Sequence, residues 1–330
     1  MRMSGERILV IATTGLERFV PALGPMAALR AHHHGATIIL LTTALIAAFA
    51  ASSPYFNDVW VDDTAGSRSV GRWIALRRRL REQPFDRVYD FDASPHSKTL
   101  FWLMYGRRAF FDRNTIPWSG AIPGTALDRA DPNHAAMHLV DGWTAQLRAA
   151  GVHGVLRTDV SWVARQVRAF TMPFRMDEAF VLFSLDPGPG APWPAENYAD
   201  LARIMDLDGK RPVLVGFEQA AAMVTKITAR CPTAVDLTGK ISVNDLIFLT
   251  WAAAAAVGPD NGIMHLTAAA GCPTVVLFDR ASDPALVAPR GDVVTILRRD
   301  QLADIPVSEV ASSLRRGRST PKRSPRLPLA

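Results

Sequence analysis

The residues best suited to chemistry lie in one short polar segment, residues 258–266, which follows an apolar run. Those that could face a ligand are Asp260, Asn261, Gly262, Met264 and His265. Either Asp260 or Asn261 can cap a helix that carries His265, and Gly262 would let a ligand approach the backbone. The free N–H groups of a helix start suit a diphosphate. The segment fits a nucleotide-sugar site, although a capped helix with a structural histidine explains it equally well.

The elements that would position this segment alternate between strand-like and helix-like runs. Strands are predicted at residues 8–12, 37–43, 59–62, 87–91 and 108–111, and again at 180–185, 212–217, 234–237, 253–258, 274–278 and 293–297. Helices are predicted at 22–31, 70–80, 196–205, 219–229, 243–251 and 264–270. This alternation favours parallel sheets covered on both faces, and two such series predict an α/β chain with two Rossmann-like domains. Ligands of open sheets bind beyond the carboxyl ends of the strands, here in a cleft between the domains.

Charge is distributed unevenly along the 330 residues. Six of the 37 Lys and Arg residues lie in the last sixteen positions, which leaves 31 basic against 31 acidic residues elsewhere. We therefore predict a neutral body and a basic, disordered tail at residues 315–330. Such a tail suits an anionic lipid surface, at about 1 kcal/mol per basic residue near it, or only aids solubility. A neutral body and a tail without aromatic residues argue against nucleic-acid binding.

Other features limit the class of protein. Two cysteines, Cys231 and Cys272, exclude a disulfide scaffold and zinc-ribbon spacing, and both are predicted to be buried thiols. Residues 8–11 are too short for a signal-peptide core, and no stretch approaches the roughly 20 apolar residues of a membrane span. We expect a soluble cytoplasmic protein. The run His32, His33 and His34 is predicted to be a solvated helix end rather than a metal site, because consecutive residues on a helix point in different directions.

With its surroundings, the polar segment resembles the nucleotide-binding half of glycosyltransferase family 9, the bacterial heptosyltransferases. That family typically has Asp-(Ser/Thr)-Gly-Pro-Met-His, an Ala-rich helix, Gly-x-Pro and a strand ending Leu-Phe-Gly. Here the matching residues are Asp260-Asn261-Gly262-Ile263-Met264-His265, Gly271-Cys272-Pro273 and Leu277-Phe278-Asp279. The match continues upstream in Trp193-Pro194 and in residues 236–240, and weaker landmarks lie at 8–11, 19–25, 53–63 and 85–90. The resemblance covers residues 7–314.

The resemblance implies a GT-B fold, an inverting mechanism, and no metal or other cofactor. It implies ADP-heptose as the donor and the lipopolysaccharide core, or a related glycan, as the acceptor, with the protein peripheral on the inner membrane. Residues 1–165 would form the acceptor-side domain, 166–178 the hinge and 179–314 the nucleotide-sugar-binding domain. The donor-binding residues would be Asp260, Asn261, Gly262, Met264 and His265, with Lys240 in the upstream match.

The chain departs from the family pattern where the chemistry takes place. The base that deprotonates the acceptor hydroxyl is expected to be an Asp in the loop after the first strand, but Arg18 occupies that position. Arginine cannot act as a base at neutral pH. Glu17 is the candidate replacement, unless Glu17 and Arg18 are ordinary loop charges. Ala12 and Ala191 stand where the family has cations that would face the diphosphate, and Arg18 or Lys240 could supply that charge.

The end of the strand at 87–91 carries a second set of candidates. Asp92 is an alternative base, and His96 and Lys98 could contact an acceptor carboxylate or phosphate. A simple loop explains these residues as well.

Three functions compete at this point. The near full-length resemblance favours an active heptosyltransferase-like enzyme. The changes at Ala12, Arg18 and Ala191 would suit the alternative, a non-catalytic relative that binds a nucleotide, a glycan or a partner enzyme, but the active enzyme is the favoured interpretation. An NAD-dependent oxidoreductase is disfavoured, because no Gly-x-Gly-x-x-Gly follows the first strand.

Overall fold

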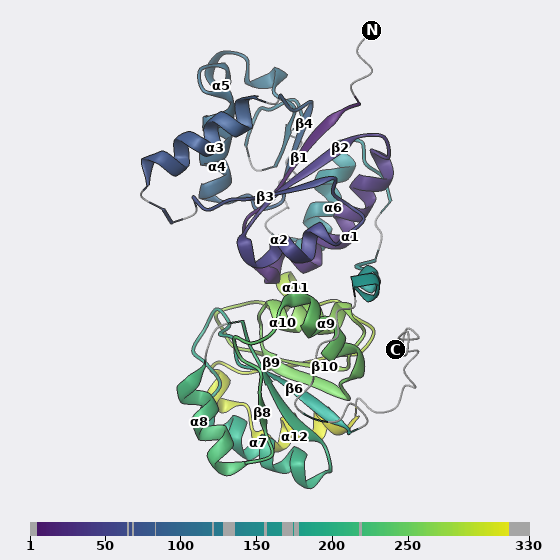
Figure 1. The fold of residues 1–330 in the computed structure, drawn as a ribbon, viewed down its shortest axis with the longest axis vertical. Helices are drawn as coiled ribbons and strands as arrows, with labels where there is room; N and C mark the ends of the chain where they lie inside the picture. The colour runs from purple at the N-terminus through teal and green to yellow at the C-terminus, as the bar shows by residue number, and fades with distance from the viewer. Residues whose placement is uncertain are drawn as a thin grey trace. The chain divides into compact units, whose positions relative to one another are not determined.

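The computed structural model forms two compact units, Met1–Thr158 and Asp159–Ala330 (Figure 1). It describes residues 5–64, 66–67, 69–82, 84–120, 122–127, 136–154, 157–166, 174, 178–217 and 220–316. The predicted hinge at 166–178 falls almost wholly outside these residues, as does the predicted tail beyond residue 316, and both stay predictions. None of the described helices is long and apolar enough to cross a membrane.

The first unit is a parallel sheet of five strands in the order β3-β2-β1-β4-β5. Its strands are β1 (Arg7–Ala12), β2 (Thr37–Thr42), β3 (Asp58–Val61), β4 (Arg87–Asp90) and β5 (Trp118–Ser119). Its α-helices are α1 (Leu16–His32), α2 (Ala44–Ala51), α3 (Val70–Glu82), α4 (Pro95–Tyr105), α5 (Arg108–Phe111) and α6 (Leu139–Ala149), and η1 (Arg113–Thr115) is a 3-10 turn.

Burial explains why β1 lies at the centre of this sheet. Consecutive residues from Ile8 to Ile11 are all fully buried, so both faces of the strand are covered, as in parallel sheets generally. Leu9 and Ile11 share one face and pack with Leu76 of α3 and Phe101 of α4. Helix α1 packs against helix α6. The strands of this sheet end in polar residues at its carboxyl edge, so a site is expected at that edge.

Two sequence predictions fail in the first unit. Residues 108–111 form the short helix α5 rather than a strand: both phenylalanines are exposed and only Ala109 is buried, so the segment does not have the alternating burial of a sheet strand. The fifth strand is Trp118–Ser119 instead. His33 is buried rather than solvated, because its ring nitrogens lie 2.7 Å from Glu6 Oε2 and 3.0 Å from the Tyr89 hydroxyl.

The second unit is a parallel sheet of six strands in the order β11-β10-β9-β6-β7-β8. Its strands are β6 (Phe180–Ser184), β7 (Arg211–Val215), β8 (Val235–Asp236), β9 (Ala255–Pro259), β10 (Thr274–Phe278) and β11 (Val294–Arg298). Its α-helices are α7 (Ala195–Leu207), α8 (Ala221–Arg230), α9 (Val243–Ala252), α10 (Gly262–Ala269), α11 (Pro284–Val287) and α12 (Val307–Arg316), with 3-10 turns η3 (Ser161–Gln166) and η4 (Leu302–Asp304). All six predicted strands are present, and both cysteines are buried and free as predicted.

Helix α12 corrects the predicted start of the basic tail. Arg315 and Arg316 belong to its last turn, and Arg315 donates two hydrogen bonds to the Asp208 carboxylate, at 2.7 and 3.0 Å. Val310 and Leu314 anchor the helix in the core beside α7. The apolar face of residues 307–314 thus keeps the chain helical through Arg316, so the predicted disordered tail does not begin at residue 315.

Candidate functional site

Asn261 fixes the helix start at the carboxyl edge of the second sheet. It has extended backbone angles, and its Oδ1 accepts a hydrogen bond from the Met264 N–H at 3.2 Å, which makes it the N-cap of α10. Its Nδ2 donates to Ser184 Oγ at 2.9 Å and to the Asp186 carbonyl at 2.7 Å. Of the two cap residues that the sequence allows, the structure therefore uses Asn261, and this side chain also ties α10 to the end of β6.

The backbone at this helix start offers donors. The N–H groups of Gly262 and Ile263 have no protein partner within the described residues, and they lie at the positive end of the helix dipole. Met264 differs, because its N–H is already used by the Asn261 cap. Two main-chain donors at a helix start are suited to an oxyanion such as a phosphate.

Asp260 and His265 lie beneath the helix start rather than on its surface. Their side chains are 9% and 3% exposed, and His265 Nε2 lies 3.7 Å from Asp260 Oδ1. That separation allows charge attraction when His265 is protonated but exceeds a hydrogen bond. The pair therefore supports the turn from inside.

Glycines let the loop after β6 lie directly against this edge. A Cβ on Gly188 would lie 3.0 Å from the Asp260 carbonyl oxygen, and one on Gly258 would lie 2.6 Å from Ser184 Cβ. A Cβ on Gly190 would collide with the Asp279 carboxylate. Ala191, where the family carries a cation, is exposed in the same loop. The close approach requires small residues, so the loop contributes backbone rather than long side chains.

Lys240 lies farther along the same sheet. It follows β8, which is separated from β9 by β6 and β7. Its Nζ donates to the Asp236 carbonyl at 3.0 Å and forms an ion pair with the Asp236 carboxylate. Burial would raise the pKa of Asp236, but hydrogen bonds from Lys240 and Thr238 outweigh it and hold the pKa below its ordinary value. The Lys240 charge is therefore partly balanced by its own neighbour.

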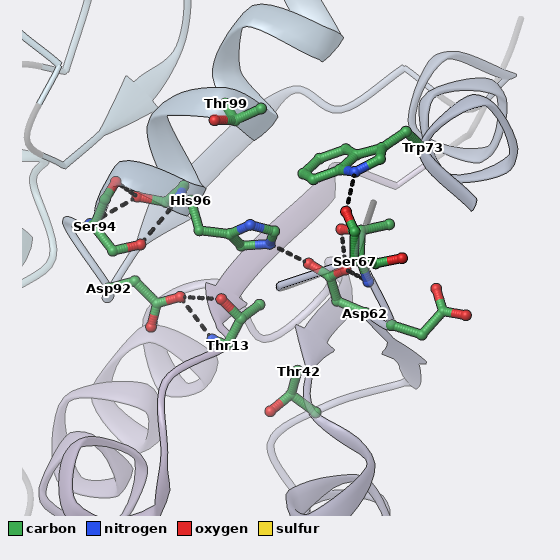
Figure 2. Close-up of polar contacts among 12 residues, drawn as sticks. Thr13, Thr42, Asp62, Ser67, Trp73, Asp92, Ser94, His96 and Thr99 are labelled. Atoms are coloured by element: carbon green, nitrogen blue, oxygen red, sulfur yellow. Dashed lines mark hydrogen bonds and ion pairs between the residues drawn. The ribbon is translucent and has the colours of Figure 1, made fainter. Parts of the chain in front are cut away.

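On the first sheet, Asp92 joins the loops that follow β4 and β1 (Figure 2). Its Oδ2 accepts from the Thr13 N–H at 2.7 Å and the Thr13 hydroxyl at 2.6 Å. Its Oδ1 accepts from the Thr14 N–H at 3.3 Å and the Thr14 hydroxyl at 2.9 Å. A carboxylate has about four lone-pair positions, so these four bonds occupy them. Asp92 thereby positions the loop that leads into α1.

Glu17 and Arg18 begin α1 beyond that loop. Glu17 is exposed, and its carboxylate folds back over Gly15 so closely that a Cβ there would collide with it. The Arg18 guanidinium lies 5.5 Å from the centre of the Trp143 ring and donates to the Asp92 carbonyl at 3.3 Å. Arg18 is thus held against an aromatic ring.

Two buried aspartates that the sequence analysis did not select lie at this edge. Asp90 ends β4 and accepts from Ser97 Oγ at 2.8 Å and from the N–H groups of Asp92 and Ala93, both at 3.0 Å. Burial raises the pKa of Asp90 to about 6. The other is Asp62, directly after β3. Asp90 is the last residue of β4 and Asp62 directly follows β3, so a carboxylate at a strand end is the signal that could have identified them.

Asp62 and His96 form a close pair (Figure 2). His96, in the first turn of α4, places Nε2 2.6 Å from Asp62 Oδ2. Asp62 Oδ1 accepts from the Thr64 N–H at 2.8 Å and from the Thr64 hydroxyl at 2.5 Å. Burial would raise the pKa of Asp62, but hydrogen bonds from His96 and Thr64 leave it below the ordinary value. Lys98, on the same helix, is exposed. The edge thus brings together Asp92, His96 and Asp62.

The comparison with known families identifies the chain. The model of glycosyltransferase family 9 (heptosyltransferase) matches residues 73–314, well over half of the chain. The chain belongs to glycosyltransferase family 9. Family 9 membership confirms the predicted resemblance and, at the level of the family, the predicted transferase.

Similar proteins include ones named as lipopolysaccharide or lipooligosaccharide heptosyltransferases. The chain is 25% identical over 266 residues to lipopolysaccharide heptosyltransferase 2 of Escherichia coli, covering 71% of this chain and 70% of that protein. It is 31% identical over 116 residues to lipooligosaccharide heptosyltransferase 2 of Haemophilus influenzae, a region that spans 34% of this chain and 33% of that protein.

Solved structures confirm the predicted GT-B type α/β fold. The structure of the E. coli ADP-heptose lipopolysaccharide heptosyltransferase II matches with a TM-score of 0.74 at 21% identity, covering 94% of this chain and 98% of that one. The E. coli heptosyltransferase WaaC with ADP matches with a TM-score of 0.72 at 16% identity, over 94% of this chain and 99% of that one.

The family 9 match divides the candidate residues. Asp92, His96, Lys98, Lys240 and the α10 segment lie inside residues 73–314, whereas Glu17, Arg18 and Asp62 precede them. Among the described residues, no group of three or more His, Cys, Asp or Glu side chains is arranged to hold a metal ion. The structure gathers the donor candidates Asp260 to His265 at one helix start, with Lys240 apart from them.

Proposed function

We propose that this family 9 protein is an inverting, metal-independent heptosyltransferase that moves a sugar from ADP-heptose to the lipopolysaccharide core or a related glycan. The observation that carries this proposal is the capped start of α10, with the Gly262 and Ile263 amides unpaired in the described chain above the buried Asp260–His265 pair. Relatives named as lipopolysaccharide heptosyltransferases support the donor and acceptor class.

The donor diphosphate would lie at the start of α10, where main-chain amides and the helix dipole meet its charge without a metal. Asn261 and Met264 would keep the helix start in shape through the cap hydrogen bond at 3.2 Å. Asp260 and His265 would support the turn from below. Lys240 is proposed as a second positive charge along the same sheet edge.

The acceptor would meet the carboxyl edge of the first sheet. Lys98 is exposed there, and Arg18 lies over Trp143 beside the Asp92 carbonyl, so both can offer charge to an acceptor phosphate or carboxylate. Glu17 remains a candidate base because it is exposed at the start of α1. Asp92 is better suited to positioning, because Thr13 and Thr14 occupy its lone pairs.

Incubation of the purified chain with ADP-heptose and heptose-deficient lipopolysaccharide tests the proposal. We expect release of ADP and an acceptor mass increased by one heptose, measured by mass spectrometry. Asn261→Ala should weaken ADP binding in calorimetry. Failure to bind ADP or ADP-heptose, together with no transfer from other nucleotide sugars, would exclude the proposed activity.

A non-catalytic role is the second candidate, and specific substitutions favour it. Ala12, Arg18 and Ala191 replace three charged residues that the family pattern leads us to expect. A chain with this role would bind ADP in calorimetry, yet it would transfer no sugar to any glycan offered. Turnover that is lost on changing one side chain of the first sheet edge would exclude this second role.

We also propose that the exposed surface of α5 contacts an anionic membrane, such as the inner face of the bacterial inner membrane. Phe110 and Phe111 are 71% and 76% exposed, and the exposed residues Arg107 and Arg108 precede them. Apolar rings flanked by arginines match the chemistry of an anionic lipid surface. The basic residues beyond 316 would add to the attraction.

Sedimentation with lipid vesicles tests this surface. The chain should pellet with vesicles that contain phosphatidylglycerol and remain in solution with pure phosphatidylcholine. The double variant Phe110→Ser/Phe111→Ser should reduce pelleting, whereas Ile74→Ser, an exposed apolar residue on α3, serves as the control. Equal pelleting of all three proteins would exclude α5 as the docking surface, and truncation after Arg316 would measure the contribution of the tail.

A further inference from the structure

We propose that His96, oriented by Asp62, is the general base that removes the proton from the acceptor hydroxyl. This inference rests on the transferase function proposed above. It assigns the chemistry to a histidine pair at the carboxyl edge of the first sheet, rather than to the loop after β1, where Arg18 occupies the expected position of the base.

A general base needs a lone pair that the protein leaves available and a fixed direction. The 2.6 Å contact between His96 Nε2 and the Asp62 carboxylate assigns the proton to Nε2 and the lone pair to Nδ1. No atom of the described residues forms a hydrogen bond with Nδ1, and the His96 side chain is 18% exposed. The ring is therefore fixed at Nε2, while Nδ1 has no hydrogen-bond partner among the described residues.

Asp62 has the properties of the orienting partner. Its side chain is fully buried, and Thr64 holds the oxygen that does not face His96. Because hydrogen bonds keep the pKa of Asp62 below its ordinary value despite burial, the carboxylate stays ionised near neutral pH. An ionised carboxylate stabilises the imidazolium that forms when the base takes a proton.

The start of α4 holds His96 in place. Ser94 Oγ accepts from the Ser97 N–H at 3.1 Å, and Ser97 Oγ accepts from the Ser94 N–H at 3.0 Å. Pro95 occupies the first position of the helix, where its fixed φ suits a helix start. The Trp73 ring lies 5.6 Å from the His96 ring, centre to centre. His96 therefore leaves a rigid turn with its ring positioned on two sides.

Charged groups lie on the four segments next to His96: the loop after β3, α3, the loop before α4, and α4 itself. Asp62 follows β3, and next to it Asp63 pairs with Arg72 of α3. Asp92 lies in the loop before α4, and Lys98 lies on α4 itself. The Asp62 carboxylate is the one in hydrogen-bond contact with the ring, so it is the group that would respond most directly to protonation of His96.

The other candidates lack one of these properties. Asp92 has its four lone-pair positions committed to Thr13 and Thr14. Glu17 is exposed and folds back over Gly15, with no partner among the described residues that fixes its direction toward a substrate.

The reaction balances with this assignment. The acceptor O–H proton passes to Nδ1 of His96 as the acceptor oxygen forms a bond to the anomeric carbon. The bond between that carbon and the diphosphate oxygen breaks, and its electron pair leaves with the nucleoside diphosphate. The imidazolium carries the proton against the Asp62 carboxylate and later releases it to solvent from its exposed side. The carboxyl ends of β3 and β4 are where a ligand of such a sheet is expected to bind.

The decisive variant is His96→Gln. The amide of glutamine can still donate to Asp62 but cannot take a proton, so the fold is retained while the base is removed. We expect kcat to fall about 10²- to 10⁴-fold, the usual contribution of a general base, with ADP affinity in calorimetry unchanged. Thr99→Ala on the same helix is the control, because Thr99 is exposed and its hydroxyl bonds only to the Pro95 carbonyl among the described residues.

A pH profile and chemical rescue separate a base from a structural residue. Wild-type kcat should fall on the acidic side as His96 is protonated, and this limb should be absent in His96→Gln. Added imidazole should restore part of the activity of His96→Ala. Unchanged kcat in His96→Gln, or loss confined to Glu17→Gln, overturns the assignment of the base. A wild-type chain that binds ADP-heptose but never transfers it overturns the transferase function as well, so the two failures are distinct.

Discussion

The carboxyl edges of the two sheets use different parts of the chain. In the second unit, the side chains of Asn261, Asp260 and His265 face inward and support a helix start whose backbone amides face outward. In the first unit, the polar groups are side chains: Asp92 binds the threonines of the β1–α1 loop, and Asp62 binds His96.

This difference affects how well each edge can tolerate a change of side chain. A site built from backbone amides tolerates substitution, because any residue type provides an N–H once the helix is capped. A site built from side chains depends on each residue. Arg18 in place of an aspartate removes a base from one position, but a neighbouring strand end can supply another. Our proposals accordingly place the donor at the start of α10 and the base at His96 rather than at position 18.

The largest effect in this comparison is expected for Asp92→Ala. The substitution leaves two N–H groups and two hydroxyls of Thr13 and Thr14 without their acceptor. We expect the free energy of unfolding to fall by about 3 kcal/mol, measured by urea denaturation. Asp112→Ala, at an exposed position, is the control. A loss equal to that of the control would mean that Asp92 does not hold the loop.

The pH dependence of stability tests the same edge at Asp90. Burial raises its pKa to about 6 from 3.8, so the folded chain binds the proton more tightly than the unfolded chain. Its contribution to stability is fully present below about pH 4 and is lost as the pH rises through about 6, by about 3 kcal/mol at most. Asp62 has the opposite sign, because its pKa is lowered and its contribution is lost as the pH falls.

Subtracting the Asp90→Asn profile from the wild-type profile isolates this group. The difference in unfolding free energy should change between pH 4 and 6 and be flat above pH 7. A flat difference over the whole range would show that Asp90 ionises normally in the folded chain.

A smaller effect is expected at the donor edge from Asn261→Ala. Loss of the cap should cost about 1 kcal/mol of stability and weaken ADP binding about tenfold, since the amides of α10 lose their fixed direction. Ser242→Ala is a matched control, because Ser242 caps α9 of the same unit through the Asp245 N–H. It should lose similar stability with no change in ADP affinity. Equal affinity losses in both variants would locate the effect in folding rather than in binding.

The smallest effect is expected for Lys240→Ala. Its side chain is largely exposed and already paired with Asp236, so an added attraction for a diphosphate is screened by solvent. ADP affinity should fall about two- to threefold at low salt and less at high salt. A tenfold loss of ADP affinity that persists at high salt would show instead that Lys240 contacts the donor directly.

Much of the fold could be predicted from the sequence because buried parallel strands are continuous apolar runs. Strands β1, β2, β6 and β10 have this form, and the sequence narrowed the α10 cap to Asp260 or Asn261, of which the structure uses Asn261. The strand predicted at 108–111 failed because a short run with two phenylalanines has no periodicity that separates strand from helix.

The Asp62–His96 pair could not be predicted, because its members lie 34 residues apart in the chain. Asp62 follows β3, and His96 follows β4, with β2 and β1 between these strands in the sheet. Strand order and the direction of α4 together create the contact, and neither is encoded in local spacing. The sequence identified His96 as a polar residue at a strand end, while its partner became visible only in three dimensions.

Ala93 lies in the turn between the end of β4 and the start of α4. It is the described non-glycine residue with a left-handed φ, 51°, and its N–H is held by the Asp90 carboxylate. This conformation costs on the order of 1 kcal/mol or more and persists because the surrounding bonds over-determine it. The amide hydrogens of Asp92, Ala93, Ser94 and Ser97 each have a side-chain acceptor, so they should exchange with solvent slowly and together. Because this turn connects β4 to α4, we expect the His96 imidazole to be held as firmly as β4 itself.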